Sequence, residues 1–252
     1  MRRFFEVDNI LVVRDLKVWF PIRKGIFSRT SGYVKAVDGV SFVLHRGETL
    51  GVVGESGSGK STIARVITGL QKPMEGSFTL DGKVAMVFQD PLGSLNPRMT
   101  VRAVLGEALG SRSGQESASP FSLLGMVGLD ASALDKYPHE FSGGQRQRIC
   151  IARAIAAKPE LLVCDEAVSA LDLSIRAQVL DLLEDLKKKL GLSLLFITHD
   201  LGVVQHIADR ILVMNRGKIV EEGPCGQVLR APREEYTRYL ISSVPKIGRP
   251  LT

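Results

Sequence analysis

Residues 54–61 have the composition and spacing of a loop that binds phosphate groups, Gly54-Glu55-Ser56-Gly57-Ser58-Gly59-Lys60-Ser61. The glycines allow consecutive backbone N–H groups to surround phosphate oxygens without a Cβ in the way. The loop follows a β-branched run at 49–53 and leads into a helical pattern, whose first N–H groups favour an anion. We expect Lys60 to reach the β- and γ-phosphates of a nucleoside triphosphate, the Ser61 hydroxyl to bind Mg²⁺, and Thr62 to belong to the same site.

Two acidic residues directly follow the apolar run at 161–164. A phosphate loop needs a carboxylate for its metal, and Asp165 can hold Mg²⁺ through a water molecule. Glu166 can accept a proton from an attacking water. An acidic pair of this kind can also cap a helix on the surface. Combined with the phosphate loop, however, the pair predicts a nucleoside triphosphatase.

A third motif indicates which kind of nucleoside triphosphatase this is. The segment Phe141-Ser142-Gly143-Gly144-Gln145 resembles the LSGGQ signature of ABC-type ATPases, with Phe141 where the family usually has Leu. Ser142 and the amides of Gly143 and Gly144 stand at the start of a helical pattern that begins at Gln145, which makes a second anion site. In that family the signature closes over the γ-phosphate held by the opposite subunit. The resemblance therefore implies ATP bound between two subunits.

Other positions agree with the same family. Gln89 matches the glutamine that touches the metal and the attacking water and that links to the membrane subunits. Asp172 ends the stretch 169–172, which matches the family's D-loop. His199 matches the switch histidine that contacts the γ-phosphate, although a lone histidine after a strand is more often structural.

From about residue 12 to residue 239, the chain looks most similar to the ATP-binding subunits of dipeptide, oligopeptide and nickel importers. The segments that carry this narrower resemblance are Phe88-Gln89-Asp90-Pro91, Ser94-Leu95-Asn96-Pro97-Arg98, residues 165–172 and Glu235-Tyr236-Thr237. Three features depart from that group: a short connection between Asp81 and Phe88, Glu234-Glu235 in place of His-Pro, and the lack of a cysteine cluster. The first two weaken any assignment of the solute, and the third argues against an iron–sulfur centre.

This resemblance implies a peripheral subunit at the cytoplasmic face of the cell membrane, which energises uptake of peptides or a related small solute such as nickel. Its implied partners are a second ABC ATPase subunit (a paralogue), two membrane permease subunits and, indirectly, an extracytoplasmic solute-binding protein. The family also stacks adenine on an aromatic residue of the N-terminal strands, where base–aromatic stacking contributes about 1–3 kcal/mol. Tyr33 fits this role by its distance along the chain from Lys60, and Phe20 fits it by its strand position. A core-packing role is equally consistent with Phe20, so we favour Tyr33 as the adenine partner.

Several elements must form to position these residues. Alternating patterns predict N-terminal strands at 11–13, 16–20, 34–37 and 40–44, with a polar loop between the second and the third. Buried-strand patterns at 161–164 and 194–197 flank an amphipathic helical pattern at 175–190, which predicts a parallel α/β sheet. A helix is expected at 145–157, and a hairpin with a tight turn at 211–221.

We therefore expect an α/β fold: a P-loop NTPase of the ABC cassette type, with a RecA-like core, an N-terminal antiparallel β-subdomain and a helical subdomain. The ATP-binding domain is predicted to span residues 7–240, with the helical subdomain at about 91–157 and a C-terminal tail at 241–252.

The composition fits this class. The chain has 252 residues, of which 44% are hydrophobic and 24% charged, and a net charge of +6 is a mild imbalance, so we expect no nucleic-acid partner. The first residues lack the apolar segment of a signal peptide, and no apolar run is long enough to span a membrane. The cysteines, Cys150, Cys164 and Cys225, are widely spaced, which favours a reducing cytoplasm over a metal cluster.

Two alternatives to a role in transport are less consistent with the sequence. A soluble ABC ATPase of DNA repair or translation would carry a long coiled coil between the motifs or two full cassettes, and the sequence has one cassette and no sustained heptads. A non-hydrolysing regulatory subunit would have lost Glu166 or His199, and the sequence retains both.

Overall fold

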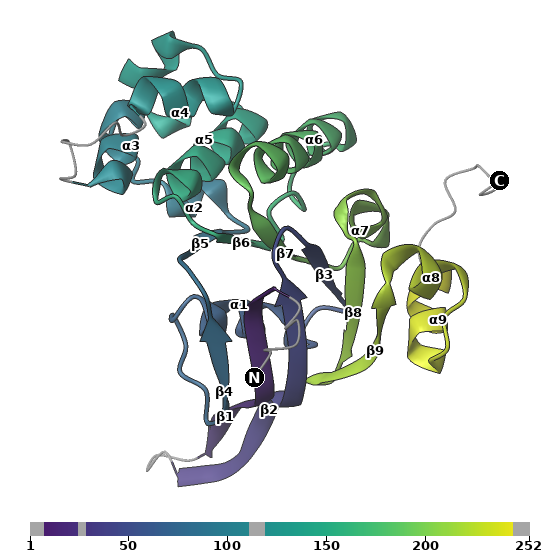
Figure 1. Cartoon of the computed structure of the whole chain (residues 1–252). Coiled ribbons are helices and arrows are strands. Elements are labelled where there is room, and N and C mark those ends of the chain that lie inside the picture. Colours follow the sequence, from purple (N-terminus) through teal and green to yellow (C-terminus); the bar gives the residue numbers. More distant parts are fainter. Residues whose placement is uncertain (1–7, 25–28, 111–118, 244–252) are drawn as a thin grey trace, which may run out of the picture.

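The computed structural model describes residues 8–24, 29–110 and 119–243. Figure 1 shows three layers: helices at one end, a mostly parallel sheet in the middle, and an antiparallel sheet at the other end. The expected domain start at residue 7 lies outside the described residues, as does most of the expected C-terminal tail at 241–252.

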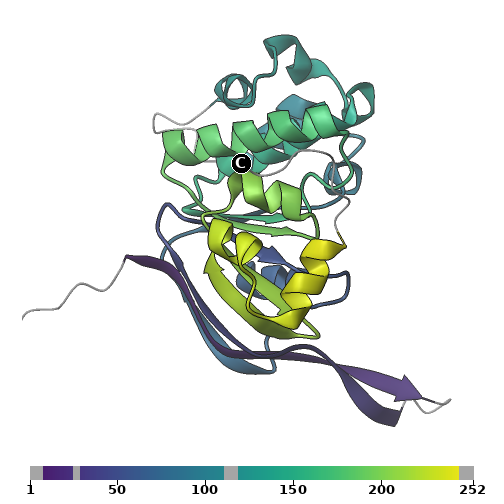
Figure 2. The same cartoon turned by 90° about the vertical axis from the view of Figure 1, so that its right-hand side faces the viewer.

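The antiparallel sheet has the strand order β2-β1-β4, from β1 (Asn9–Lys24), β2 (Arg29–His45) and β4 (Glu75–Leu80). The prediction of four short N-terminal strands was wrong, because the expected breaks are bulges within two long strands. Asp15 (φ 44°) and Gly39 (φ 78°) mark these bulges, and the Asp15 N–H donates to Ser41 Oγ at 2.8 Å. Residues 21–24 and 29–33, expected in a loop, extend the hairpin well beyond the body of the molecule (Figure 2).

The central sheet has the order β5-β6-β7-β3-β8-β9. Its strands are β3 (Thr49–Val53), β5 (Val84–Val87), β6 (Leu161–Asp165), β7 (Ser193–Thr198), β8 (Arg210–Asn215) and β9 (Lys218–Pro224). Neighbouring strands from β5 to β8 run parallel, as expected, and every residue of β3, β6 and β7 is buried. β9 joins antiparallel through the predicted tight turn, where Arg216 (φ 47°) and Gly217 (φ 80°) both have positive φ.

Helices cover both faces of this sheet. On one face α1 (Lys60–Ile67) packs between the two sheets, against alternate residues of β6 such as Leu161 and Val163. On the other face the intervening residues, Leu162 and Cys164, pack against the helical layer. This layer contains α2 (Pro91–Ser94), α3 (Val101–Leu109), α4 (Pro120–Met126), α5 (Gly143–Ala156) and α6 (Leu173–Leu190).

The helical layer also contains two 3-10 helices, η1 (Ala131–Asp135) and η2 (Pro138–Glu140). The remaining helices of the described chain are α7 (Leu201–Ile207), α8 (Cys225–Arg230) and α9 (Glu235–Ser242). α8 and α9 lie beside β9 in both Figure 1 and Figure 2. Within the described ranges, none of the helices is both long and apolar enough to cross a membrane.

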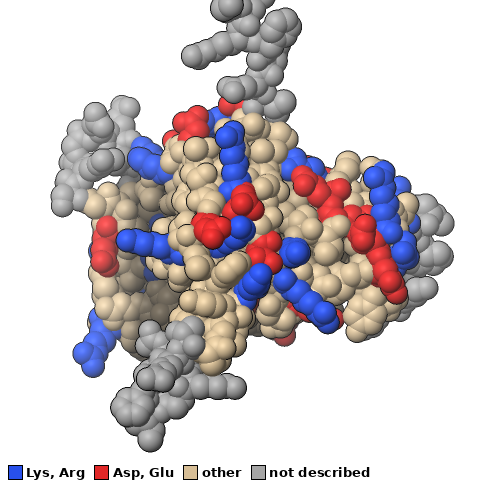
Figure 3. Space-filling view, turned by 90° about the horizontal axis from the view of Figure 1, so that it is seen from below, with Lys and Arg blue, Asp and Glu red and all other residues tan. Residues whose placement is uncertain are grey.

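Basic and acidic side chains are interleaved over the face seen in Figure 3. Some pair across strands of the antiparallel sheet, as Lys17 of β1 does with Glu75 of β4, whose Nζ and Oε2 atoms are 2.8 Å apart.

Candidate active site

The predicted phosphate loop connects β3 to α1 and is fixed by both sheets. A Cβ on Gly54 (φ 152°) would lie 2.2 Å from the carbonyl oxygen of Met214 in β8, and one on Gly59 (φ 107°) would lie 2.1 Å from that of Ala36 in β2. Gly217, in the β8–β9 turn, donates its N–H to the Ser58 carbonyl at 3.0 Å. Gly54 and Gly59 are therefore required by packing as well as by backbone conformation.

Lys60 is enclosed by the loop that it ends. Its Nζ donates to the carbonyl oxygens of Gly54 (2.8 Å) and Glu55 (2.7 Å) and to Ser58 Oγ (3.3 Å). Burial lowers the pKa of the Lys60 ammonium, and the nearby charges of Glu166 and Asp165 oppose this. The ammonium group of Lys60 is thus held by oxygen atoms of the loop, within reach of a phosphate oxygen bound there.

The predicted metal ligands meet beside the loop. Ser61 Oγ donates to Asp165 Oδ1 at 2.8 Å, which joins the start of α1 to the end of β6. Burial raises the pKa of Asp165, and the hydrogen bond from Ser61 opposes the rise. A hydroxyl and a carboxylate oxygen, with the amide oxygen of Gln89 in the same cleft, are hard oxygen ligands of the kind that Mg²⁺ prefers.

The three predicted catalytic residues form one network. Glu166 Oε2 accepts a hydrogen bond from Gln89 Nε2 at 3.0 Å, and Glu166 Oε1 lies 3.3 Å from His199 Nδ1. Each residue follows the carboxyl end of a parallel strand, respectively β6, β5 and β7, and these ends meet at one edge of the sheet. Glu166 itself has a left-handed backbone (φ 49°), although its N–H still bonds to the Ile197 carbonyl at 2.9 Å.

One cleft of about 660 Å³ joins these groups. Most of the predicted residues line it, namely Gly54, Glu55, Ser56, Gly57, Gly59, Lys60, Ser61, Thr62, Gln89, Glu166 and His199. Asp165 and Ser58 lie directly behind this lining, through their bonds to Ser61 and Lys60. Sequence reasoning missed Ala36 and three residues at the end of α9, which are Tyr239, Leu240 and Ser243.

The signature residues are not brought to this cleft. Ser142 caps α5: its Oγ accepts from the Gln145 N–H at 3.3 Å, so its own proton is left to donate elsewhere. A Cβ on Gly144 would lie 2.4 Å from Ile175 Cγ2, and the neighbouring Gly143 is exposed. Asp172 is exposed at the start of α6. The signature residues, for which a second anion site is predicted, therefore form a separate surface on the helical layer.

Neither predicted adenine partner lines the cleft. Tyr33 pairs with Pro21 on the β1–β2 hairpin, and its ring centroid lies 6.2 Å from that of Trp19. Phe20 is 40% exposed on the same hairpin. Among the described residues, the aromatic side chain that lines the cleft is Tyr239. Near Tyr239, only the segment Glu235-Tyr236-Thr237 is distinctive in the sequence, through its resemblance to the importer subunits. Nothing in that segment predicts a position beside the phosphate loop.

Residues 37–169 match the ABC transporter family, and the chain belongs to it. The predictions of an ABC-type ATPase and of its fold, with a P-loop α/β core, an antiparallel β-subdomain and a helical subdomain, are thereby confirmed.

Within the ABC transporter family, the chain is similar to ATP-binding proteins of peptide transport. The chain is 48% identical over 259 residues to the oligopeptide transport ATP-binding protein AppF of Bacillus subtilis (strain 168), covering 94% of this chain and 79% of the relative. It is 46% identical over 259 residues to the dipeptide transport ATP-binding protein DppF of Escherichia coli (strain K12), covering 95% and 77%. A solved dimer of the ATP-binding cassette MJ0796, bound to ADP and Pi, superposes with a TM-score of 0.73 and 26% identity over 85% of this chain and 98% of the other.

Proposed function

We propose that this chain binds and hydrolyses ATP as the energising subunit of an importer for peptides. The observation that supports ATP hydrolysis is the single cleft in which the Lys60 loop faces the network of Glu166, Gln89 and His199. The relatives' names, oligopeptide and dipeptide transport ATP-binding proteins, support peptides over nickel as the solute. The same names do not favour a soluble ABC ATPase of DNA repair or translation.

Different residues of the chain bind the phosphates, activate the attacking water and hold the metal. The loop amides and Lys60 bind the β- and γ-phosphates. Glu166 orients the attacking water and takes its proton, while Gln89 and His199 hold the Glu166 carboxylate between them. Ser61, Asp165 and Gln89 would hold Mg²⁺, which when bound neutralises the charge that develops on the phosphate oxygens.

A second subunit completes the site. Because Ser142, Gly143, Gly144 and Gln145 lie away from the cleft, they are free to meet the γ-phosphate held by another cassette, and Asp172 belongs to the same surface. We expect this partner to be a paralogue. Two permease subunits, to which Gln89 would link, place the complex at the cytoplasmic face of the membrane, and an extracytoplasmic solute-binding protein acts through them.

The nucleotide assignment is tested by Lys60→Ala. The variant should lose ATP binding in calorimetry, since it removes the cation enclosed by the phosphate loop. Lys188→Ala, which removes an exposed lysine from α6, is the matched control and should bind as the unmodified protein does. Wild-type affinity in Lys60→Ala would refute the assignment.

The assembly is tested by copurification from native membranes. We expect a paralogous cassette and two permease subunits to accompany the chain. Recovery of a homodimer alone would contradict the proposed heterodimer and leave the nucleotide site unaffected.

A further inference from the structure

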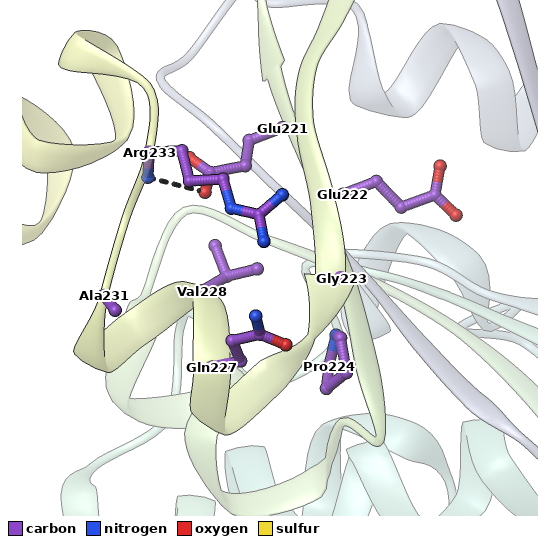
Figure 4. Close-up of a pocket in the computed structure, with 8 residues that line it drawn as sticks. All are labelled: Glu221, Glu222, Gly223, Pro224, Gln227, Val228, Ala231 and Arg233. Atoms are coloured by element: carbon purple, nitrogen blue, oxygen red, sulfur yellow. Dashed lines mark hydrogen bonds between the residues drawn. The ribbon is translucent and has the colours of Figure 1, made fainter.

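Helix α9 is anchored at its start by a buried carboxylate. Glu221 of β9 accepts hydrogen bonds from the backbone N–H groups of Arg233 (2.9 Å) and Glu234 (3.2 Å), and Glu234 is the residue that immediately precedes α9. Figure 4 shows the bond between Glu221 and Arg233 across the space between β9 and the α8–α9 connection. Leu240, further along α9, is buried in a cluster with Val53 of β3 and Val213 of β8. The helix is therefore held by both polar and apolar contacts.

The same helix contacts the phosphate loop. Tyr236 Oη accepts a hydrogen bond from the Glu55 N–H at 3.2 Å. The carbonyl of Glu55 is in turn bonded to Lys60 Nζ at 2.7 Å. One residue of the loop is thus fixed at its N–H by a tyrosine hydroxyl and at its C=O by the buried lysine.

One turn further along α9, Tyr239 stands in the cleft itself. It is 57% exposed, and Leu240 and Ser243 line the cleft beside it. An exposed tyrosine at the edge of a phosphate loop presents a hydroxyl that can donate to a phosphate oxygen.

We propose that α9 is part of the nucleotide site: Tyr236 is a positioning residue that fixes the phosphate loop through Glu55, and Tyr239 contacts the phosphate end of the bound nucleotide. This inference rests on the proposed function, since it requires that the cleft bind a nucleoside triphosphate. Loss of the Tyr236 hydroxyl removes the hydrogen bond to the Glu55 N–H. Glu55, whose carbonyl binds Lys60, then keeps only one of its two restraints.

Tyr236→Phe tests the positioning role, because it keeps the ring and removes the hydroxyl. The affinity for the non-hydrolysable analogue AMP-PNP, measured by calorimetry, should fall roughly two- to tenfold, as expected for one net hydrogen bond. A merely structural role of the hydroxyl would lower the unfolding midpoint without nucleotide and leave the affinity of the folded protein for AMP-PNP unchanged. Tyr137→Phe, a tyrosine of the helical layer, is the matched control.

Tyr239→Ala tests the contact at an exposed position that tolerates truncation. A loss of affinity for AMP-PNP of roughly two- to tenfold is again expected. Phe121→Ala removes an aromatic ring of similar exposure, 64%, from α4 and should leave the affinity unchanged. Inorganic tripolyphosphate should lose affinity in parallel, because the inferred contacts lie at the phosphate end.

The outcomes separate the two proposals. If both tyrosine variants match their controls while Lys60→Ala loses binding, the inference about α9 is overturned and the nucleotide site stands. Loss of AMP-PNP affinity with unchanged tripolyphosphate affinity would also overturn it, because the contacts would then lie at the base. If Tyr236→Phe lowers the unfolding midpoint and leaves the AMP-PNP affinity unchanged, the positioning role of Tyr236 is overturned. Wild-type binding in Lys60→Ala would overturn the site itself.

Discussion

Glu166→Gln separates chemistry from binding in this site. The carboxylate accepts from Gln89 Nε2 on one oxygen and faces His199 Nδ1 with the other. Glutamine has the same shape, so its amide oxygen can accept from Gln89 while its amide nitrogen donates to His199 Nδ1 in the tautomer protonated at Nε2. The substitution therefore preserves the network and removes the proton affinity of the group.

The size of the effect is that of losing the general base. General-base assistance contributes about 10²–10⁴ in rate, or roughly 3–5 kcal/mol of barrier. Phosphate release should fall by that factor in the assembled complex, while ATP affinity in calorimetry stays near wild type because Lys60 and the loop amides are untouched. Glu184→Gln, on the surface of α6, is the matched control and should turn over normally.

Because binding survives, the variant should accumulate as an ATP-bound dimer with its partner. Gel filtration with ATP and Mg²⁺ should show the shift to larger size, and adding Ser142→Arg should abolish it by blocking the signature. Near wild-type turnover in Glu166→Gln would refute the assignment of the base, and His199 would be tested next.

Three further outcomes are expected. Gly144→Ala should lower the free energy of unfolding by about 1–3 kcal/mol in urea titrations, because its Cβ would lie 2.4 Å from Ile175 Cγ2, whereas Gly143→Ala meets its nearest neighbour at 3.7 Å and should be close to neutral. Burial opposes ionisation of Glu221, but hydrogen bonds led by the one from the Arg233 N–H lower the pKa of this carboxyl below the ordinary 4.5. The unmodified protein should therefore be more stable than Glu221→Gln at neutral pH, and this difference in unfolding free energy should disappear as the pH falls through the folded-state pKa. Equal differences at pH 7 and pH 3 would contradict this expectation. Burial raises the pKa of Cys164 to about 12, so a thiol reagent at pH 8 should leave this thiol unmodified in the folded protein and react with it in denaturant.

The sequence predicted the parts of the site that are local in the chain. The phosphate loop, Asp165 and Glu166 each sit at a strand end that the apolar runs reveal, and parallel strands bring such ends together. Long-range contacts had no such signal. Tyr33 was favoured for its distance from Lys60, yet its strand carries it onto a hairpin beside Trp19, and the bulges at Asp15 and Gly39 that lengthen this hairpin resemble ordinary strand breaks in the sequence.

The placement of α9 was equally hidden. It depends on Glu221, which the sequence places in a hairpin among residues expected to be exposed. In the structure Glu221 is buried, and its carboxylate accepts a hydrogen bond from the connection between α8 and α9. A single sequence gives no reason to pair Tyr236 with Glu55, since the two residues are 181 positions apart in the chain.

The left-handed backbone of Glu166 limits how this protein can be stabilised. Four non-glycine residues of the described chain have a positive φ, and of these Glu166 is the one that lines the cleft. Such a conformation costs about 1–3 kcal/mol for a side-chain-bearing residue, so glycine would be the best residue here for folding alone. A search for thermostable variants that ignores activity should therefore select glycine at this position, and the resulting protein should bind ATP but hydrolyse it as slowly as Glu166→Gln does.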